Sequence, residues 1–321
     1  MFALLLGLTQ IQTPLKNNDK SPSSKIVNNG RWFPCPQREP SKYYYETYCA
    51  CYTPIWIAAF AIIVIFELYE SFDATTYNLV CGGLALPFLL QPLLLPSARM
   101  LSSPNSSSPD ALRPFGKRYA TKANLWLATY SFIGNYWYTH YFYSVLQAKY
   151  TMPSSRLNNV PLAMYFATHF YFSSYHVFSN LLLRKIRTSY ARSISRTFLT
   201  LSTVFVLSYF TAFMETLTIS SFPYYSFEDR HMAYTIGSAF YGIYFLVSFP
   251  AFAVFDEGID HRPYDDKDDA DDETRKGNEI NDITLWDTFV QSCGYGMIIL
   301  CLLDFVRLYL DIPLVVGVIH N

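Results

Sequence analysis

Charged residues are scarce in this sequence. Asp, Glu, Lys and Arg make up 15% of its 321 residues, against about 25% in an average soluble domain. The 24 basic and 25 acidic residues nearly cancel, so no net field draws the chain to nucleic acid. Six cysteines are too few and too irregularly spaced for a disulfide scaffold or a zinc knuckle. We interpret them as reduced packing residues.

The sequence also lacks the motifs of several enzyme classes. It contains no Walker loop, no GxGxxG, no HExxH and no GxSxG. Its six histidines are scattered, whereas membrane di-iron hydroxylases and desaturases carry theirs in HxxxH and HxxHH clusters. We therefore expect no metal site and no bound redox cofactor or nucleotide.

Apolar residues are abundant, at 51% of the chain, and they gather in long stretches. A membrane-spanning helix needs about 20 such residues, and a soluble helical core hardly supplies seven such runs. The second stretch contains Pro87 and Pro92 and is expected to be kinked or re-entrant. The sequence predicts an all-α, polytopic membrane helix bundle with about seven transmembrane helices, at 53–69, 77–95, 123–145, 162–183, 197–219, 234–255 and 286–310.

The basic residues between these stretches predict the orientation of the bundle. Twenty of the 24 lie on loops of one face, three lie on the other, and Arg307 falls inside the seventh stretch. Because Lys and Arg concentrate on cytoplasmic loops, we expect the amino terminus in the cytoplasm and the carboxyl terminus on the opposite side.

Composition divides the chain into three parts. We expect a disordered, polar amino-terminal tail at 1–42, a membrane domain at 43–311 and a short carboxyl-terminal tail at 312–321. Within the domain, a Ser/Pro-rich insert occupies 99–114 and an acidic loop occupies 256–282. The loop lacks the glycine and spacing of an EF-hand and is interpreted as a solvated spacer. The apolar residues 1–8 lack the flanks of a signal peptide.

Polar residues recur at helical spacing inside four of the predicted spans. Ionisable groups in a membrane are expensive and mark functional sites, and their faces are expected to point inward. Glu215 is the strongest candidate, because no basic residue lies within four positions of it. The faces are Ser208, Thr211, Glu215 and Thr218; His169, Ser173, His176 and Asn180; Tyr136, His140 and Tyr143, with Asn135 and Thr139 beside them; and Tyr241, Tyr244 and Ser248.

Each of these faces also has a purely structural interpretation. Ser and Thr in membrane helices often bond their own backbone carbonyls. His140 lies among Trp137, Tyr138 and Tyr141, which resemble an aromatic belt at a headgroup boundary. Asp304 and Arg307 are three residues apart on one helix and are expected to neutralise each other.

The order of several motifs resembles the cycloeucalenol cycloisomerase family. The resemblance extends over residues 43–311 and leaves out the amino-terminal tail, the Ser/Pro-rich insert and the acidic insert. It is carried by 68–72 (LYESF), 122–126 (KANLW), 134–142 (GNYWYTHYF), 150–154 (YTMPS), 158–161 (NNVP), 175–180 (YHVFSN), 222–230 (FPYYSFEDR) and 244–250 (YFLVSFP), with Glu215-Thr216, Asp256-Glu257 and Leu303-Asp304.

The resemblance implies an isomerase that opens the 9β,19-cyclopropane ring of cycloeucalenol to give obtusifoliol. Such a reaction adds a proton to C19 and removes one from C8, so it needs an acid, a base and a wall that tolerates a cation. A carboxyl in a low-dielectric pocket keeps its proton near neutral pH, and Glu215 fits the acid. The base or relay would be His169 or His176, with His140 a further catalytic candidate. Glu70, Asp229 and Asp304 are the alternatives for the base.

Substrate contacts complete the hypothesis. Aromatic faces stabilise a cation without trapping it, and Tyr136, Trp137, Tyr241 and Tyr244 are the candidates. The 3β-hydroxyl group would bind Asn180, or alternatively Asn158 or Asn159. The expected partners are a cyclopropyl sterol, the lipid bilayer and other membrane enzymes of the sterol pathway, with a multi-pass location in the endoplasmic reticulum membrane. A sterol-binding receptor or transporter, or a sterol double-bond isomerase, remains an alternative.

Overall fold

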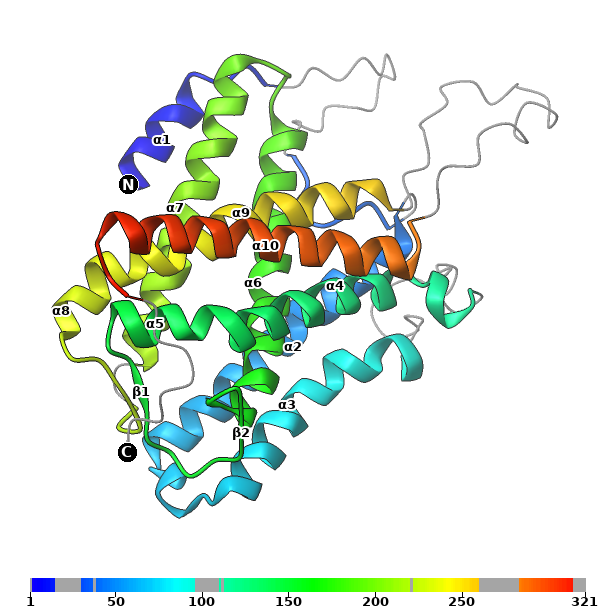
Figure 1. Cartoon of the computed structure of the whole chain (residues 1–321). Helices are drawn as coiled ribbons and strands as arrows, with labels where there is room; N and C mark the ends of the chain where they lie inside the picture. Colours follow the sequence, from blue (N-terminus) through cyan, green and yellow to red (C-terminus); the bar gives the residue numbers. More distant parts are fainter. Residues whose placement is uncertain are drawn as a thin grey trace, which may run out of the picture.

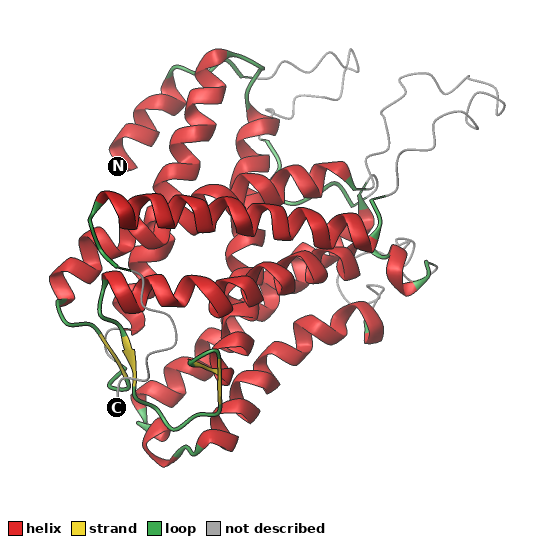
Figure 2. Ribbon diagram, in the orientation of Figure 1, coloured by secondary structure: helices red, strands yellow, loops and turns green. Residues whose placement is uncertain are grey.

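Helices make up most of the computed structural model, which describes residues 2–14, 30–36, 39–95, 110, 113–219, 222–259 and 283–313. Beside the helices lie two antiparallel two-stranded ladders, β1 (Lys149–Tyr150) with β4 (Tyr225–Ser226) and β2 (Arg156–Leu157) with β3 (Val160–Pro161). The architecture is therefore helical, as predicted (Figure 1; Figure 2). The long helices are α2 (Pro40–Ile65), α3 (Ala74–Leu94), α4 (Tyr119–Ile133), α6 (Leu162–Ser189), α7 (Ile194–Ile219), α9 (Ser238–Gly258) and α10 (Leu285–Tyr309).

Two of these helices are extended by π-helical segments. η4 (Gly134–Tyr138) joins α4 to α5 (Thr139–Val145), and η5 (Ala233–Gly237) joins the short α8 (Arg230–Met232) to α9. With these joins counted, each predicted span corresponds to one long helical segment.

Side-chain contacts fix the relative directions of the helices. Tyr48 and Tyr52 of α2 donate hydrogen bonds to the Pro87 and Leu84 carbonyls of α3 in reverse order, so α2 and α3 are antiparallel. Glu46 and Thr53 of α2 bond Arg184 and Ser174 of α6 in reverse order, so α6 runs in the opposite sense to α2. Ring and hydrogen-bond pairs show in the same way that α6 runs in the opposite sense to α4 and in the same sense as α9. The number of crossings and their orientation stay predictions.

Five helical segments are long and apolar enough to cross a membrane: Pro40–Ile65, Ala74–Leu94, Ile194–Ile219, Arg230–Glu257 and Leu285–Tyr309. The remaining two, α4–α5 and α6, are more polar because they lie inside the bundle. α6 contacts α2, α3, α4, α7 and α9, and it runs steeply across α4, α9 and α10 in Figure 1. The outer helices instead expose large apolar side chains, such as Ile65 at 73% and Phe305 at 68%, which suits contact with lipid.

The first two helices differ from the predicted boundaries. α2 begins at Pro40, inside the predicted polar tail, and ends at Ile65 because Glu67 takes a left-handed conformation (φ 52°). α3 runs unbroken through Pro87 and Pro92. The tyrosines of α2 and the Arg118 guanidinium bind carbonyls around both prolines, so backbone groups next to the prolines keep partners.

The amino-terminal prediction needs a correction. Residues 1–42 are not disordered as a whole, because α1 (Phe2–Gln10) packs against α7 and Pro14 forms a β-bridge with Tyr190. Most of the remaining tail, the insert, the acidic loop and the carboxyl-terminal tail lie outside the described residues, at 15–29, 96–109, 260–282 and 314–321.

Candidate active site

A small cavity lies where α6, α7 and α9 meet the two π-helical segments. Its volume is about 70 Å³, and its walls come from η4, α5, α6, α7, η5, α9 and the strands β1 and β4. We call it the Glu215 cavity, because Glu215 is the one acidic or basic side chain among the described residues that line it. Its polar lining consists of Asn135, Thr139, Tyr150, Thr168, Glu215, Thr216, Tyr225, Tyr241 and Tyr244.

Glu215 has one hydrogen-bonded and one unbonded carboxyl oxygen. The hydroxyl of Tyr241 donates a hydrogen bond to Oε1 at 2.9 Å. The Tyr175 hydroxyl of α6 is a second hydrogen-bonding neighbour of the carboxyl, but Oε2 is buried and makes no hydrogen bond of normal geometry in the described part of the chain. No Lys or Arg of the described residues lines the cavity, so the carboxyl has no cation there to hold it ionised. Because Oε2 has almost no exposed surface, a bound molecule reaches it only when the cavity widens.

Aromatic rings form the apolar walls beside the carboxyl. Tyr241 and Tyr244 meet edge to face with ring centroids 5.1 Å apart, and Phe142 packs on both at 5.3 and 5.9 Å. Tyr138 contacts the other side of Tyr244 at 4.5 Å. These rings surround the space next to Glu215, and a positive charge over the face of one of them would be stabilised.

Two loops distant in sequence supply another wall. β1 and β4 pair in the register Tyr150 opposite Tyr225, and the two rings stack with centroids 4.3 Å apart. Burial raises the pKa of both phenols, so both stay neutral at physiological pH. Sequence reasoning missed these residues as site components, although both lie in motifs that carry the family resemblance.

The π-helical segments shape the cavity at two glycines. Gly134 of η4 and Gly237 of η5 both line it. A Cβ atom at Gly237 would lie 3.0 Å from a methyl carbon of Leu146, so a larger residue there would crowd the wall. π-bulges are rare and are frequent at functional sites, and no local sequence signal predicted these two.

The three candidate histidines lie outside the cavity lining. His176 is buried, its Nδ1 lies 2.7 Å from the Phe172 carbonyl oxygen and its Nε2 lies 2.9 Å from the Ser248 hydroxyl. His169 is buried beside Phe88, and His140 is buried beside Tyr143. The structure therefore does not bring these rings to the carboxyl of Glu215.

Only some of the residues predicted to bind substrate line the cavity. Tyr241 and Tyr244 line the cavity, whereas Tyr136, Trp137 and Asn180 do not. Trp137 is 45% exposed and packs against Tyr136, and Asn180 is buried with both amide atoms unbonded. Of the nine residues predicted for the site, the cavity thus unites three.

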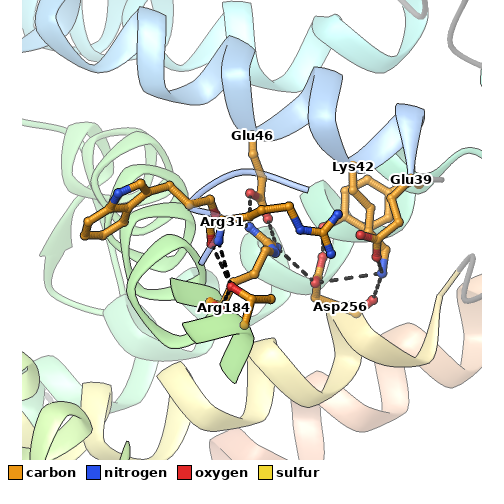
Figure 3. Close-up of polar contacts among 9 residues, drawn as sticks. Arg31, Glu39, Lys42, Glu46, Arg184 and Asp256 are labelled. Carbon is orange, nitrogen blue, oxygen red and sulfur yellow. Dashed lines mark hydrogen bonds and ion pairs between the residues drawn. The ribbon is translucent and has the colours of Figure 1, made fainter. Parts of the chain in front are cut away.

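A buried cluster of charges lies at the other end of α6 (Figure 3). Arg184 binds both carboxyl oxygens of Glu46 at 2.6 Å and one oxygen of Asp256 at 3.4 Å. Lys42 contacts Asp256 at 3.8 Å, and all four side chains are at most 5% exposed. Asp256 is thus a residue of α9, not of the predicted acidic loop. We call these four residues the ion cluster. It joins the ends of α2, α6 and α9.

The ion cluster is separate from the Glu215 cavity. Arg184 follows Thr168 by 16 positions on α6, a rise of about 24 Å. All four charges have partners of opposite sign, so the cluster has no unpaired group to offer a substrate. Its role in the fold is to hold three helices together.

The chain is similar over most of its length to a curated protein. It is 38% identical over 284 residues to cycloeucalenol cycloisomerase of Arabidopsis thaliana, which covers 87% of this chain and 90% of that protein. No protein-family model matches the sequence, and no solved structure matches it.

Proposed function

The chain belongs to the cycloeucalenol cycloisomerase family, a family of isomerases, and from this membership we propose that it opens the 9β,19-cyclopropane ring of cycloeucalenol to give obtusifoliol. The observation that carries the proposal is the carboxyl of Glu215. It lines an aromatic cavity, has a free buried oxygen and has no cationic partner there.

Glu215 delivers the proton in the first step. The electron pair of the C9–C19 bond takes the proton of the carboxyl group, so a new C–H bond forms at C19 and a positive charge develops at C9. Cyclopropane carbon is a weak base, so the acid must be protonated and held close to it. The Tyr241 hydroxyl holds one oxygen of the carboxyl and leaves the other free to face the ring.

The same carboxylate takes the second proton. C8 is bonded to C9, and the electron pair of the C8–H bond becomes the new double bond as the proton leaves. No other acidic or basic group of the described residues lines the cavity, and the candidate histidines lie outside its lining. A proton given and a proton regained leave the enzyme unchanged, so the reaction needs no cofactor.

Aromatic rings stabilise the charge between the two steps. Tyr241, Tyr244 and Phe142 stand next to Glu215 with their rings in mutual contact. A desolvated cation–π contact is worth about 2 kcal/mol. Because the rings cannot form a stable bond to the cation, they lower its energy without trapping it.

The cavity must widen to take a sterol. Its volume of about 70 Å³ is below the 300–1,000 Å³ or so of pockets that hold drug-sized ligands. The Tyr150–Tyr225 wall comes from loops rather than from packed helices, which makes it the part that displaces most readily. The substrate is a membrane lipid, and we place the enzyme in the endoplasmic reticulum membrane.

A feeding assay tests this function. The chain is expressed in yeast microsomes, which lack cyclopropyl sterols, cycloeucalenol is added, and the sterols are identified by gas chromatography–mass spectrometry. We expect obtusifoliol without added nucleotide. In D₂O it should carry deuterium at C19, because the carboxyl proton exchanges with solvent between turnovers. Unchanged cycloeucalenol beside folded protein would overturn the proposal, and a shifted double bond with an intact ring in the product would indicate a different isomerase.

A further inference from the structure

Asn135 is the only amide side chain that lines the Glu215 cavity in the described part of the chain. It belongs to the π-helical segment η4 and is 6% exposed. From its position and its bonding we infer that Asn135 binds the 3β-hydroxyl group of the sterol, an inference that rests on the proposed function.

The amide of Asn135 keeps hydrogen-bonding capacity for a ligand. Its Nδ2 donates to the Ser131 carbonyl at 3.0 Å, which uses one of its two N–H groups. Its Oδ1 lies 3.4 Å from the Thr168 hydroxyl, but that hydroxyl makes its shorter bond, 2.7 Å, to the Met164 carbonyl. One donor and at least one acceptor lone pair thus remain, which is what an alcohol needs.

Three other polar groups of the lining already use their hydroxyl hydrogens. Thr168 and Thr216 donate their hydroxyl hydrogens to carbonyls one turn earlier in their own helices. The Tyr241 hydroxyl is bonded to Glu215. Asn135 therefore offers a donor and an acceptor together, and it does so away from the carboxyl.

The separation between Asn135 and Glu215 matches the distance between the 3-oxygen and C19 of the sterol. Asn135 contacts α6 at Thr168, whereas the Glu215 carboxyl neighbours the hydroxyl of Tyr175 on the same helix. Tyr175 lies seven residues beyond Thr168, a rise of about 10 Å between the two helix positions.

The sterol spans a similar length. Five single bonds separate the 3-oxygen from C19, which is at most about 6 Å. A hydrogen bond of about 2.8 Å at one end, and a proton transfer of similar reach at the other, place the two protein groups up to roughly 12 Å apart. Asn135 and Glu215 can therefore hold the hydroxyl group and the cyclopropane of one molecule at once.

Asn124 provides a matched control. It lies on the same helical segment, is also 6% exposed, and its Nδ2 donates to the carbonyl four residues earlier at 3.0 Å. It differs in that it does not line the cavity. Asn135→Leu and Asn124→Leu thus remove the same side chain from the same kind of helical position, one inside and one outside the site.

The experiment measures the affinity of cycloeucalenol and of its 3-deoxy analogue for the wild type and both variants in detergent, with product formed from cycloeucalenol assayed in parallel. We expect Asn135→Leu to weaken cycloeucalenol binding about tenfold, the loss of one buried hydrogen bond, and to leave binding of the 3-deoxy analogue unchanged. Asn124→Leu should bind both sterols as the wild type does.

Other outcomes separate this inference from the proposed function. Equal weakening of both sterols by Asn135→Leu, or no weakening of either, would overturn the role of Asn135 even if product forms. A selective loss for cycloeucalenol in Asn135→Leu, with no product from the wild type, would support the hydroxyl contact and overturn the isomerase proposal alone.

Discussion

The hydrogen bond from Tyr241 to Glu215 determines how the carboxyl is presented to the cavity. It ties α9 to α7 and leaves Oε2 free. In the proposed mechanism, Tyr241 orients the acid, and its ring helps to stabilise the cation. Removing its hydroxyl should therefore affect the chemical step more than the binding of substrate.

Tyr241→Phe is expected to lower kcat about 10- to 100-fold and to change KM little, since a hydrogen bond to a charged group is worth about 1.5–3 kcal/mol and the ring remains. Initial rates in microsomes, normalised to the amount of folded protein, measure this. Tyr209→Phe is the control, because Tyr209 donates a weak 3.4 Å bond to the Tyr234 carbonyl away from the cavity. Equal rates for the wild type and Tyr241→Phe would contradict the orienting role.

Some residues of the site could be predicted from sequence and others could not. A carboxyl in an apolar run, such as Glu215, is conspicuous because burial of a charge is expensive. Helical spacing also predicted the tyrosines of α9 as site residues. It could not predict Tyr150 and Tyr225, because pairing between the strands β1 and β4 of two separate loops brings them to the cavity. The histidines of α6 share one face by spacing, but that helix has five neighbours and spacing does not say which neighbour each residue meets.

At the scale of elements, the π-helical segment η4 sets which of its own side chains and which side chains of α5 line the cavity. A π turn adds one residue to an α-helix, so it rotates every later residue relative to the earlier ones. Asn135 lies within this segment, and Thr139 and Phe142 follow it.

Deleting Trp137 from η4 should convert the segment to regular α-helix and turn Thr139 and Phe142 away from Glu215. We expect turnover of cycloeucalenol to fall at least about 100-fold, the low end for acid–base catalysis, while the helix content by circular dichroism stays unchanged. Normal turnover by the deletion variant would contradict the role assigned to the π segment.

The ion cluster stabilises the packing of three helices and has no part in the proposed reaction. Removing one partner of a buried ion pair leaves the other uncompensated, at a cost of about 3–5 kcal/mol. Arg184→Met should therefore lower the free energy of unfolding in detergent by about this amount. Arg192→Met, at an exposed position just beyond α6, is the control and should have no such effect. A wild-type unfolding midpoint for Arg184→Met would show that Glu46 and Asp256 do not need this partner.

At the scale of the whole molecule, the structure gives one long helical segment for each predicted span. The predictions for the helices were accurate where apolar runs were long. They were less accurate at the ends of α2, where a left-handed Glu67 rather than a change in composition ends the helix. α6 carries many polar residues and is still a long helix, because it lies inside the bundle and packs against other helices.

The orientation itself is open to test. An amino-terminal tag should be digested by protease in sealed microsomes, and a carboxyl-terminal tag should be protected, because the distribution of Lys and Arg predicts that the basic loops lie on the cytoplasmic side. Protection of the amino-terminal tag, with the carboxyl-terminal tag digested, would reverse the orientation. Exposure of both tags on one side would require an even number of crossings.

The central claim is that Glu215 supplies the proton that opens the ring, and Glu215→Gln tests it most directly. Glutamine keeps the size and polarity of the side chain but cannot deliver a proton. In microsomes supplied with cycloeucalenol, we expect the variant to form obtusifoliol at least about 100-fold more slowly than the wild type, with its unfolding midpoint unchanged. Near-normal turnover by folded Glu215→Gln protein would contradict the claim.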